Sequence, residues 1–259
     1  MVPVSVVIIT YNEARNIAAC TKRAKLITDD IIIVDSGSRD GTLNIARELQ
    51  VKILERAWDG YGNNKNKGID AAKYNWILSI DADELPDHEL IAQLHSLDFN
   101  DIHSVYDFNF KVYFNSKLIR YGSWGNDHQI RLFNRAHARW LEVPVHEKLI
   151  FSKAVTVKRL TGNIHHYSVN SISEYYSKAN KYARLNALKY FEEGKKATLI
   201  KLYLSPAFNF IKNYVILSGF LDGRAGWIIA KTSVWYTWRK YSYLSEMNAS
   251  ENLPALAKK

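Results

Sequence analysis

The sequence has little cysteine and no long hydrophobic run. A single cysteine, Cys20, occurs among 259 residues, so neither an internal disulfide nor a cysteine-based zinc site can form. No stretch of about 20 uninterrupted apolar residues occurs, which argues against a membrane-spanning helix. The first apolar run, Val2 to Ile9, lacks a basic leader and is too short for a signal peptide. We therefore expect a protein of a reducing, cytoplasmic compartment.

Acidic and basic residues are unevenly distributed along the chain. The net charge is +9, and 47% hydrophobic residues indicate a globular protein rather than a disordered or collagen-like chain. Up to Asn100 there are 11 Lys/Arg against 15 Asp/Glu, which gives −4; from Asp101 onward there are 24 against 11, which gives +13. The basic second half is expected to attract an anionic partner, such as phosphate groups, nucleic acid or a membrane surface.

Short apolar runs alternate with helix-like segments in the first hundred residues. This alternation predicts an α/β fold in which a parallel sheet carries helices on both faces. Such sheets bind ligands at the carboxyl ends of their strands. The predicted strands are 4–10, 30–35, 51–54 and 76–80, and the predicted helices are 13–25, 40–49, 65–73 and 87–95.

The pattern changes after Asn100. Apolar and polar residues alternate with period two over 106–114, which predicts a half-buried strand. A capping box at Ser171 and Glu174 predicts the start of a long helix. The further predicted strands are 129–133, 145–151 and 155–160, and the predicted helices are 171–193, 199–220 and 226–244.

Two carboxylates, Asp81 and Asp83, follow the apolar run WILSI. Residues i and i+2 of a strand point to the same face, and paired carboxylates suit Mg²⁺ or Mn²⁺ bridging to phosphate oxygens. The alternative is a polar turn that starts a helix. Asp35 and the segment Thr10–Glu13 also follow predicted strands. Helix caps would explain each cluster singly, but three clusters at one sheet edge favour a binding site.

Four linked segments resemble one known family. VSVVIITYNEARNI, IIIVDSGSRDGT, NNKNKGIDAA and WILSIDADE together resemble an inverting family 2 glycosyltransferase with the GT-A fold. The later segments QIRLF, VHE, HHYS and FLDGR are similar to those of the lipopolysaccharide core glucosyltransferases, which add β-linked glucose to inner-core heptose. The resemblance ends near Tyr243.

The resemblance implies which residues bind the UDP-sugar donor. Thr10, Tyr11 and Glu13 match the segment that holds the nucleotide, and Asp35 matches the aspartate that contacts uracil. The basic and amide pair before the next helix, where the family often carries arginine, is matched by Lys65 and Asn66.

The resemblance also implies a metal site. Asp81 would lie near the ribose and the metal, and Asp83 would bind Mg²⁺ or Mn²⁺ directly, so that the metal clamps the diphosphate. His165 and His166 are candidates to reach the metal or the diphosphate from the acceptor side, and His166 is the one we assign to the metal. The alternative is that both histidines are structural.

The general base has three candidates: Asp127, Glu142 and Glu147. We favour Asp127, because it lies just before QIRLF, about where related enzymes carry their base. Glu147 is second, with His146 beside it as a positioning group. The alternative is that these are solvated loop carboxylates. Arg131 within QIRLF either binds a phosphate or pairs with a loop carboxylate.

Eleven aromatic residues lie between Ile200 and Ser245, with six Lys/Arg and one acid, Asp222. This composition on amphipathic helices is typical of a membrane interface. The alternatives are packing on the enzyme core or on a second subunit, and binding of single-stranded nucleic acid, which no motif supports.

The sequence therefore predicts a metal-dependent transferase that moves glucose from UDP-glucose to a heptose of the lipopolysaccharide inner core. Residues 1–100 would bind the nucleotide sugar, 101–195 would form the acceptor side, and 196–259 would form a helical extension. The lipid-linked acceptor implies a peripheral location on the cytoplasmic face of the inner membrane. The alternatives are another surface-glycan transferase, a sugar nucleotidyltransferase, and a non-catalytic membrane- or nucleic-acid-binding module.

Overall fold

The computed structural model describes residues 2–142 and 148–251. The chain divides into two compact units. The first, here called the sheet unit, comprises Met1–Lys111 and Asp127–Tyr167. The second, here called the helical unit, comprises Val112–Asn126 and Ser168–Lys259. The division at residues 100 and 195 expected from the sequence concerns function, and it stays a prediction.

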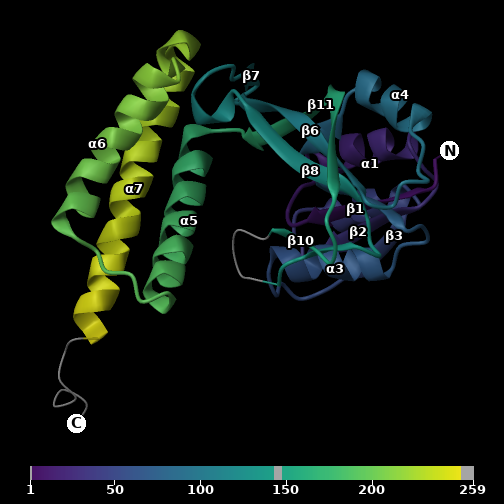
Figure 1. Ribbon diagram of the computed structural model, residues 1–259, viewed down its shortest axis with the longest axis horizontal. Helices are drawn as coiled ribbons and strands as arrows, with labels where there is room; N and C mark the ends of the chain where they lie inside the picture. The colour runs from purple at the N-terminus through teal and green to yellow at the C-terminus, as the bar shows by residue number, and fades with distance from the viewer. Residues whose placement is uncertain (1, 143–147, 252–259) are drawn as a thin grey trace. The chain divides into compact units, whose positions relative to one another are not determined.

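A nine-stranded sheet has the order β3-β2-β1-β4-β8-β6-β11-β5, with β7 paired to β6 (Figure 1). The pairs β3–β2, β2–β1 and β1–β4 are parallel, whereas β4–β8, β8–β6 and β11–β5 are antiparallel. The α/β class is confirmed, and the expected parallel arrangement holds for the strands before residue 82. The strands are Val4–Thr10 (β1), Ile31–Asp35 (β2), Lys52–Glu55 (β3), Trp76–Asp81 (β4), Glu84–Pro86 (β5), Ser104–Phe114 (β6), Lys117–Leu118 (β7), Asp127–Asn134 (β8) and Thr156–Val169 (β11). A separate ribbon pairs β9 (Ala138–Trp140) with β10 (Leu149–Phe151).

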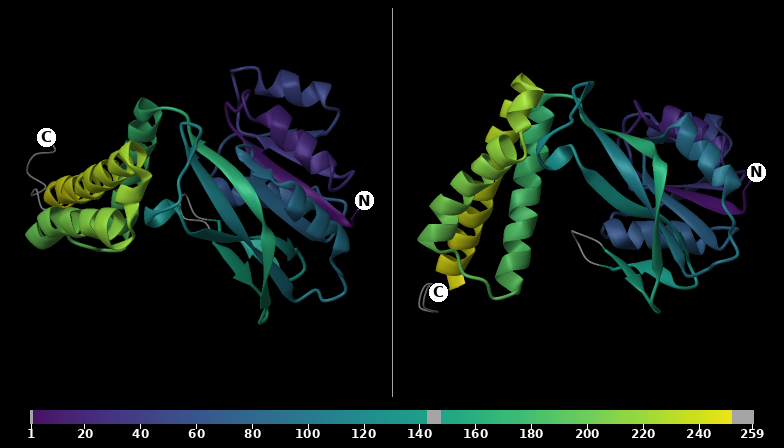
Figure 2. Two further views of the ribbon diagram at one scale, coloured as in Figure 1. Left: turned by 90° about the horizontal axis from the view of Figure 1, so that it is seen from above. Right: turned by 45° about the horizontal axis from the view of Figure 1, so that its top comes forward.

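Helices cover both faces of the parallel strands, as the sequence predicts; α1 and α3 lie on opposite sides of them (Figures 1 and 2). Gly68 of α3 permits a close approach, because a Cβ atom there would lie 2.3 Å from Val7 Cγ1 of β1. The core on this face includes Val7, Ile69 and Phe133. The helices of the sheet unit are Ile17–Lys25 (α1), Thr42–Glu48 (α2), Tyr61–Asp70 (α3) and His88–Ser96 (α4).

The helical unit is built around α7 (Arg224–Glu251), which contacts both α5 (Ile172–Glu192) and α6 (Ser205–Phe210) (Figures 1 and 2). Two π-helical segments, Ile200–Leu204 and Ile211–Ile216, flank α6. Ser171 caps α5 as predicted, since Glu174 N–H donates to Ser171 Oγ, while the side chain of Glu174 accepts the N–H of Asn170 rather than that of Ser171. No helix within the described ranges is both long enough and apolar enough to cross a membrane.

A buried aspartate joins the two sequence segments of the helical unit. The carboxylate of Asp222 is 3% exposed and accepts hydrogen bonds from the backbone N–H groups of Arg120 and Tyr121. Lys117 Nζ donates to the backbone oxygen of Asp222 at 2.6 Å. These contacts hold the loop 112–126 against the turn before α7.

Candidate active site

Three strands of the sheet unit end in polar residues at one edge. Thr10 of β1 is opposite Asp35 of β2 in register, and Ile9 of β1 is opposite Asp81 of β4. The three polar clusters of the sequence therefore lie side by side, as predicted, at the carboxyl ends where such sheets bind ligands.

Asp81 is held by a buried lysine. Lys65 of α3 is 1% exposed, and its Nζ lies 3.4 Å from Asp81 Oδ1 and 4.5 Å from the centre of the Trp140 ring. Burial acts to raise the pKa of Asp81, but the charges of Lys65 and Arg131 outweigh it and lower that pKa. Asp81 is therefore ionised at neutral pH, because a buried carboxylate keeps its charge when cations compensate it.

Arg131 pairs with carboxylates, one of the two roles left open by the sequence. Its Nη2 lies 2.5 Å from Glu84 Oε1 and 3.6 Å from Asp81 Oδ2. Arg131 as a whole residue is only 3% exposed. The other oxygen of Glu84 accepts the backbone N–H of Asp81 at 3.0 Å. Burial and the charges of Asp81 and Asp83 raise the pKa of Glu84 to about 7, against the opposing effect of Arg131.

Glu84 was not predicted as a site residue. Its position directly after Asp-Ala-Asp is the signal in the sequence that marks it. Cys20 is a second addition, since its buried thiol donates towards the backbone oxygen of Glu84 at 3.4 Å. Both residues hold the turn between β4 and β5 in place, and neither is exposed to a substrate: each is at most 1% exposed.

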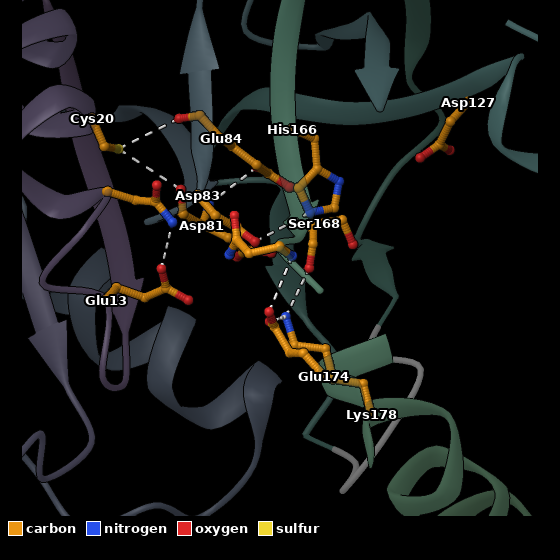
Figure 3. A network of polar contacts seen from close by, with 12 residues as sticks. Glu13, Cys20, Asp81, Asp83, Glu84, Asp127, His166, Ser168, Glu174 and Lys178 are labelled. Carbon is orange, nitrogen blue, oxygen red and sulfur yellow. Dashed lines mark hydrogen bonds and ion pairs between the residues drawn. The ribbon is translucent and has the colours of Figure 1, made fainter. Parts of the chain in front are cut away.

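Asp83, in the turn between β4 and β5, lies close to His166 of β11. His166 is opposite Glu84 in the antiparallel register, and His166 Nε2 lies 3.4 Å from Asp83 Oδ2 (Figure 3). Burial acts to lower the pKa of His166, but the hydrogen bond and charge of Asp83, with the charges of Glu84 and Asp81, raise it to about 9. His165, the residue before His166 in the same strand, has its side chain directed to the opposite face.

The chemistry of these residues fits a divalent metal. No cluster of three or more metal-binding side chains occurs in the described part of the chain. Mg²⁺ nevertheless needs few protein ligands, because it is commonly held by one or two carboxylates together with substrate phosphates. Asp81 is paired with Lys65 and Arg131, whereas Asp83 faces His166, whose imidazole can bind a metal once it has lost its proton. Asp83 is thus the carboxylate best suited to bind the ion directly.

The residues predicted to hold the nucleotide form the adjoining edge. Asp35 is fully buried, and its carboxylate accepts the N–H groups of Gly37 and Ser38 at 2.9 Å. Asn12 has a positive φ of 55° and donates its N–H to Ser38 Oγ, which links the loops after β1 and β2. Tyr11 is 57% exposed, so its ring is open to a ligand.

The other residues of this segment are less open. Thr10 is 5% exposed, and Glu13 accepts a hydrogen bond from Asn16 Nδ2 at 2.7 Å.

Asn66 of α3 is buried and exchanges hydrogen bonds with the backbone of Trp140. Its Nδ2 also lies 3.2 Å from Glu142 Oε1, so this candidate base is tied to α3.

Asp127 is separate from the carboxylates Asp81, Asp83 and Glu84. It begins β8, its Oδ2 accepts a hydrogen bond from Gln129 Nε2 at 3.0 Å, and it stands apart from Asp83 and His166 in Figure 3. A base is required beside the acceptor rather than at the metal, so this position is compatible with the predicted role. His146 and Glu147 lie outside the described residues.

Comparisons with known proteins place this geometry in a family context. The model of the family described as "Glycosyl transferase family 2" matches residues 5–160, which is more than half of the chain. A protein of Rickettsia typhi named as an uncharacterized glycosyltransferase is 29% identical over 238 residues, covering 88% of this chain and 82% of that protein. The lipopolysaccharide core biosynthesis glycosyltransferase LpsC of Rhizobium meliloti is 27% identical over 271 residues, covering 97% of each.

Among solved structures, S. aureus TarS residues 1–349 is similar with a TM-score of 0.44 and 14% identity, covering 96% of this chain and 91% of that one. A TM-score this low supports no conclusion about ligands. The family match agrees with the mixed sheet flanked by helices. The matched residues 5–160 include the strands from β1 to β10 and the residues Asp81, Asp83 and Glu84, whereas His166 lies beyond them.

Proposed function

The chain belongs to glycosyl transferase family 2, and from that premise we propose that it transfers glucose from UDP-glucose to a heptose of the lipopolysaccharide inner core. It is a glycosyltransferase enzyme of the GT-A fold type. The observation that carries the donor side of the proposal is the cluster of Asp81, Asp83 and His166 at the carboxyl end of β4, beside the edge formed by Thr10 and Asp35.

The chain's own residues would prepare this edge for a nucleoside diphosphate. Lys65 and Arg131 keep Asp81 ionised, and Arg131 with Glu84 fixes the turn that presents Asp83. Asp83 would hold Mg²⁺ or Mn²⁺ directly, together with the phosphate oxygens of the donor, with Asp81 and His166 beside it; when bound, the ion offsets the charge that develops on the leaving diphosphate. The loops after β1 and β2, which Ser38 joins, would hold the uridine.

The reaction is a single displacement at the anomeric carbon. An oxygen of the acceptor hydroxyl forms the new glycosidic bond while the bond to the diphosphate breaks, and the configuration at this carbon inverts. A general base takes the proton of the acceptor hydroxyl. We assign this base to Asp127, which begins β8 and whose carboxylate accepts a hydrogen bond from Gln129 Nε2. No covalent enzyme intermediate is needed.

The acceptor is inferred from a relative. LpsC carries lipopolysaccharide core biosynthesis in its name and aligns with this chain over nearly the full length of both. A lipid-linked acceptor would place the enzyme at a membrane, on the cytoplasmic side where nucleotide sugars are available. This part of the proposal is independent of the metal and of the base.

Calorimetric titration of the purified chain with UDP tests the donor side first. We expect binding in the presence of Mn²⁺, loss of binding in EDTA, and loss in the variant Asp83→Ala even with Mn²⁺. Asp70→Ala is the matched control, because Asp70 is a carboxylate of the same unit that is paired with Arg139 at the surface. Product analysis with UDP-glucose and defined core acceptors then tests the sugar and the linkage.

The outcomes separate the parts of the proposal. Binding of UDP that is unaffected by EDTA and by Asp83→Ala would keep a nucleotide-sugar enzyme but remove the metal site. No UDP binding in either condition would overturn the donor class. Transfer of glucose to a glycan other than inner-core heptose would overturn the acceptor and leave the chemistry intact.

A further inference from the structure

The segment from 199 to 221 in the helical unit exposes almost exclusively apolar side chains. The structure describes all of this segment, and Lys212 is the one charged residue among its exposed positions. A helix at the surface of a soluble protein normally turns its polar face to water. The exposed large residues, here called the apolar face, are Leu199, Ile200, Tyr203, Leu204, Phe208, Ile211, Val215, Ile216, Leu217, Phe220 and Leu221.

Two asparagines of the same segment point inward. Asn209 Nδ2 donates to Thr237 Oγ1 of α7 at 2.7 Å. Asn213 is 7% exposed, and its Oδ1 accepts the backbone N–H of Ser123. The arrangement is thus the reverse of an ordinary surface helix, with amide groups against the unit's interior and aliphatic and aromatic groups outside. Such a large exposed apolar patch marks an interaction surface.

The π-helical turns keep this face continuous. Exposed apolar residues recur about every four positions, slightly more than the 3.6 residues of an α-helical turn. A purely α-helical segment would gradually rotate them around its axis. The π-helical segments Ile200–Leu204 and Ile211–Ile216 hold more residues per turn, so they counteract that rotation. The rings of Tyr214 and Trp227, 5.5 Å apart, fasten the far end of the segment to α7.

The charged residues of the segment that carries the apolar face have one sign. Residues 199–221 contain Lys201 and Lys212 and no Asp or Glu; just before them, Lys195 is paired with Glu193. Lysine can lay its aliphatic stem along an apolar surface and keep its ammonium group in water. Basic residues beside an apolar helix face are attracted to anionic lipid headgroups.

A second copy of the chain fits this face poorly. In a symmetric dimer the same patch lies on both sides of the interface, so lysines of one copy would face lysines of the other without an acid between them. Like charges placed against each other disfavour association. Charge complementarity therefore selects a lipid surface as the partner.

We propose that the apolar face of residues 199–221 docks on a bilayer that contains anionic lipid, with the helix lying in the interface and its lysines at the headgroups. This proposal stands on the helical unit alone, and it goes beyond the transfer reaction proposed above. It agrees with a lipid-linked acceptor but does not need one.

Flotation of the full-length chain with lipid vesicles tests the proposal. We expect binding to vesicles of phosphatidylcholine with phosphatidylglycerol, and at least tenfold weaker binding to phosphatidylcholine alone. The double variant Leu204→Glu, Phe208→Glu should bind the mixed vesicles at least tenfold more weakly than the wild type. The control is Leu26→Glu, Val157→Glu, which makes the same charge change at exposed apolar residues of the sheet unit. Circular dichroism and UDP binding report whether each variant keeps its fold.

Each result decides for or against the apolar face. Equal loss in the test and control variants, or no vesicle binding by the wild type, would overturn the proposal. Sedimentation velocity without lipid tests whether a second copy of the chain binds the apolar face instead. If the wild type is a dimer and Leu204→Glu, Phe208→Glu makes it a monomer, the face is a dimer interface and the proposal is wrong. Failure of UDP to bind would leave this proposal intact and count against the proposed function alone.

Discussion

The two units depart from the usual distribution of side chains in opposite directions. The sheet unit buries charged groups: Lys65, Glu84 and Arg131 are each at most 3% exposed. The helical unit exposes large apolar groups, among them Leu199 at 75%. Buried charges are costly unless they are paired, and an exposed apolar face is costly in water. Each unit thus carries a feature that its own folding does not favour.

The difference separates two kinds of functional surface. In the sheet unit the buried ion pairs fix carboxylates for a small, highly charged ligand, which needs precise positions. In the helical unit the apolar face covers many residues with no cluster of polar groups, which suits a broad and uniform partner. Substitutions in the first should therefore act through few residues with large effects, and those in the second through several residues with smaller effects.

The largest expected effect is on the reaction itself. Asp127→Asn should lower kcat by about 10²–10⁴-fold, the usual effect of removing a general base, while UDP binding stays unchanged. The matched control is Glu142→Gln, at the other described candidate, whose carboxylate is tied to Asn66. Steady-state kinetics of glucose transfer gives the comparison. A kcat for Asp127→Asn within about threefold of the wild type would remove Asp127 from this role.

The next effect tests whether the buried charges of the sheet unit depend on one another. Arg131→Met leaves Glu84 buried beside two other carboxylates, and removing one partner of a buried pair costs about 3–5 kcal/mol. Urea denaturation should show this loss. The double variant Arg131→Met, Glu84→Gln should recover part of it, because glutamine does not ionise and leaves no carboxyl group buried without its partner. A single-variant loss below about 1 kcal/mol would mean that the pair is not coupled as described.

A smaller effect is expected at the buried acid of the helical unit. Asp222→Ala removes the acceptor of the Arg120 and Tyr121 N–H groups, and a buried donor left unsatisfied costs about 1–3 kcal/mol. Asp222→Asn is the control, since its amide oxygen can still accept one of these bonds. Unfolding followed by the helical circular dichroism signal measures both. Equal losses in the two variants would show that the charge, not the hydrogen bonding, is what the loop requires.

The sequence predicts strand β1 better than helix α3. The predicted strand 4–10 coincides with β1, because seven consecutive buried residues form it. The predicted helix 65–73 is α3, which instead runs from Tyr61 to Asp70. Its residues YGNNKNKGID are mostly polar, and the helix buries Asn64, Lys65 and Asn66. The polar residues that make α3 a candidate part of the site are therefore the same residues that make its bounds hard to predict from the sequence.

The sequence predicts which strand ends carry the candidate site, but it does not predict which side chains contact one another there. The polar ends of three strands follow from the sequence, since parallel strands align their carboxyl ends. The sequence does not predict the three-residue strand β5 or the continuation of β11 to Val169. Around Glu84, His165 and His166 it has no alternation of apolar and polar residues that would indicate a strand. Their antiparallel register alone brings His166 beside Asp83.

The smallest effect compares one helix cap from each unit. Asp87 caps α4 by accepting Leu90 N–H at 2.7 Å, and Ser171 caps α5 by accepting Glu174 N–H at 3.1 Å. Replacing either by alanine should cost about 1 kcal/mol at neutral pH. Partial burial acts to raise the pKa of Asp87, but hydrogen bonds from Leu90 N–H and Asn163 outweigh it and lower that pKa.

The two caps should therefore respond differently to acid. Because the folded-state pKa of Asp87 lies below its unfolded value of about 3.9, its carboxylate adds stability above that pH and loses it as the pH falls through the folded value. The cost of Asp87→Ala should shrink below about pH 4, whereas that of Ser171→Ala should not change, since serine does not titrate. Urea denaturation of both variants at neutral and acidic pH measures the difference. Parallel behaviour would mean that the charge of Asp87 contributes nothing beyond the hydrogen bond that a hydroxyl also makes.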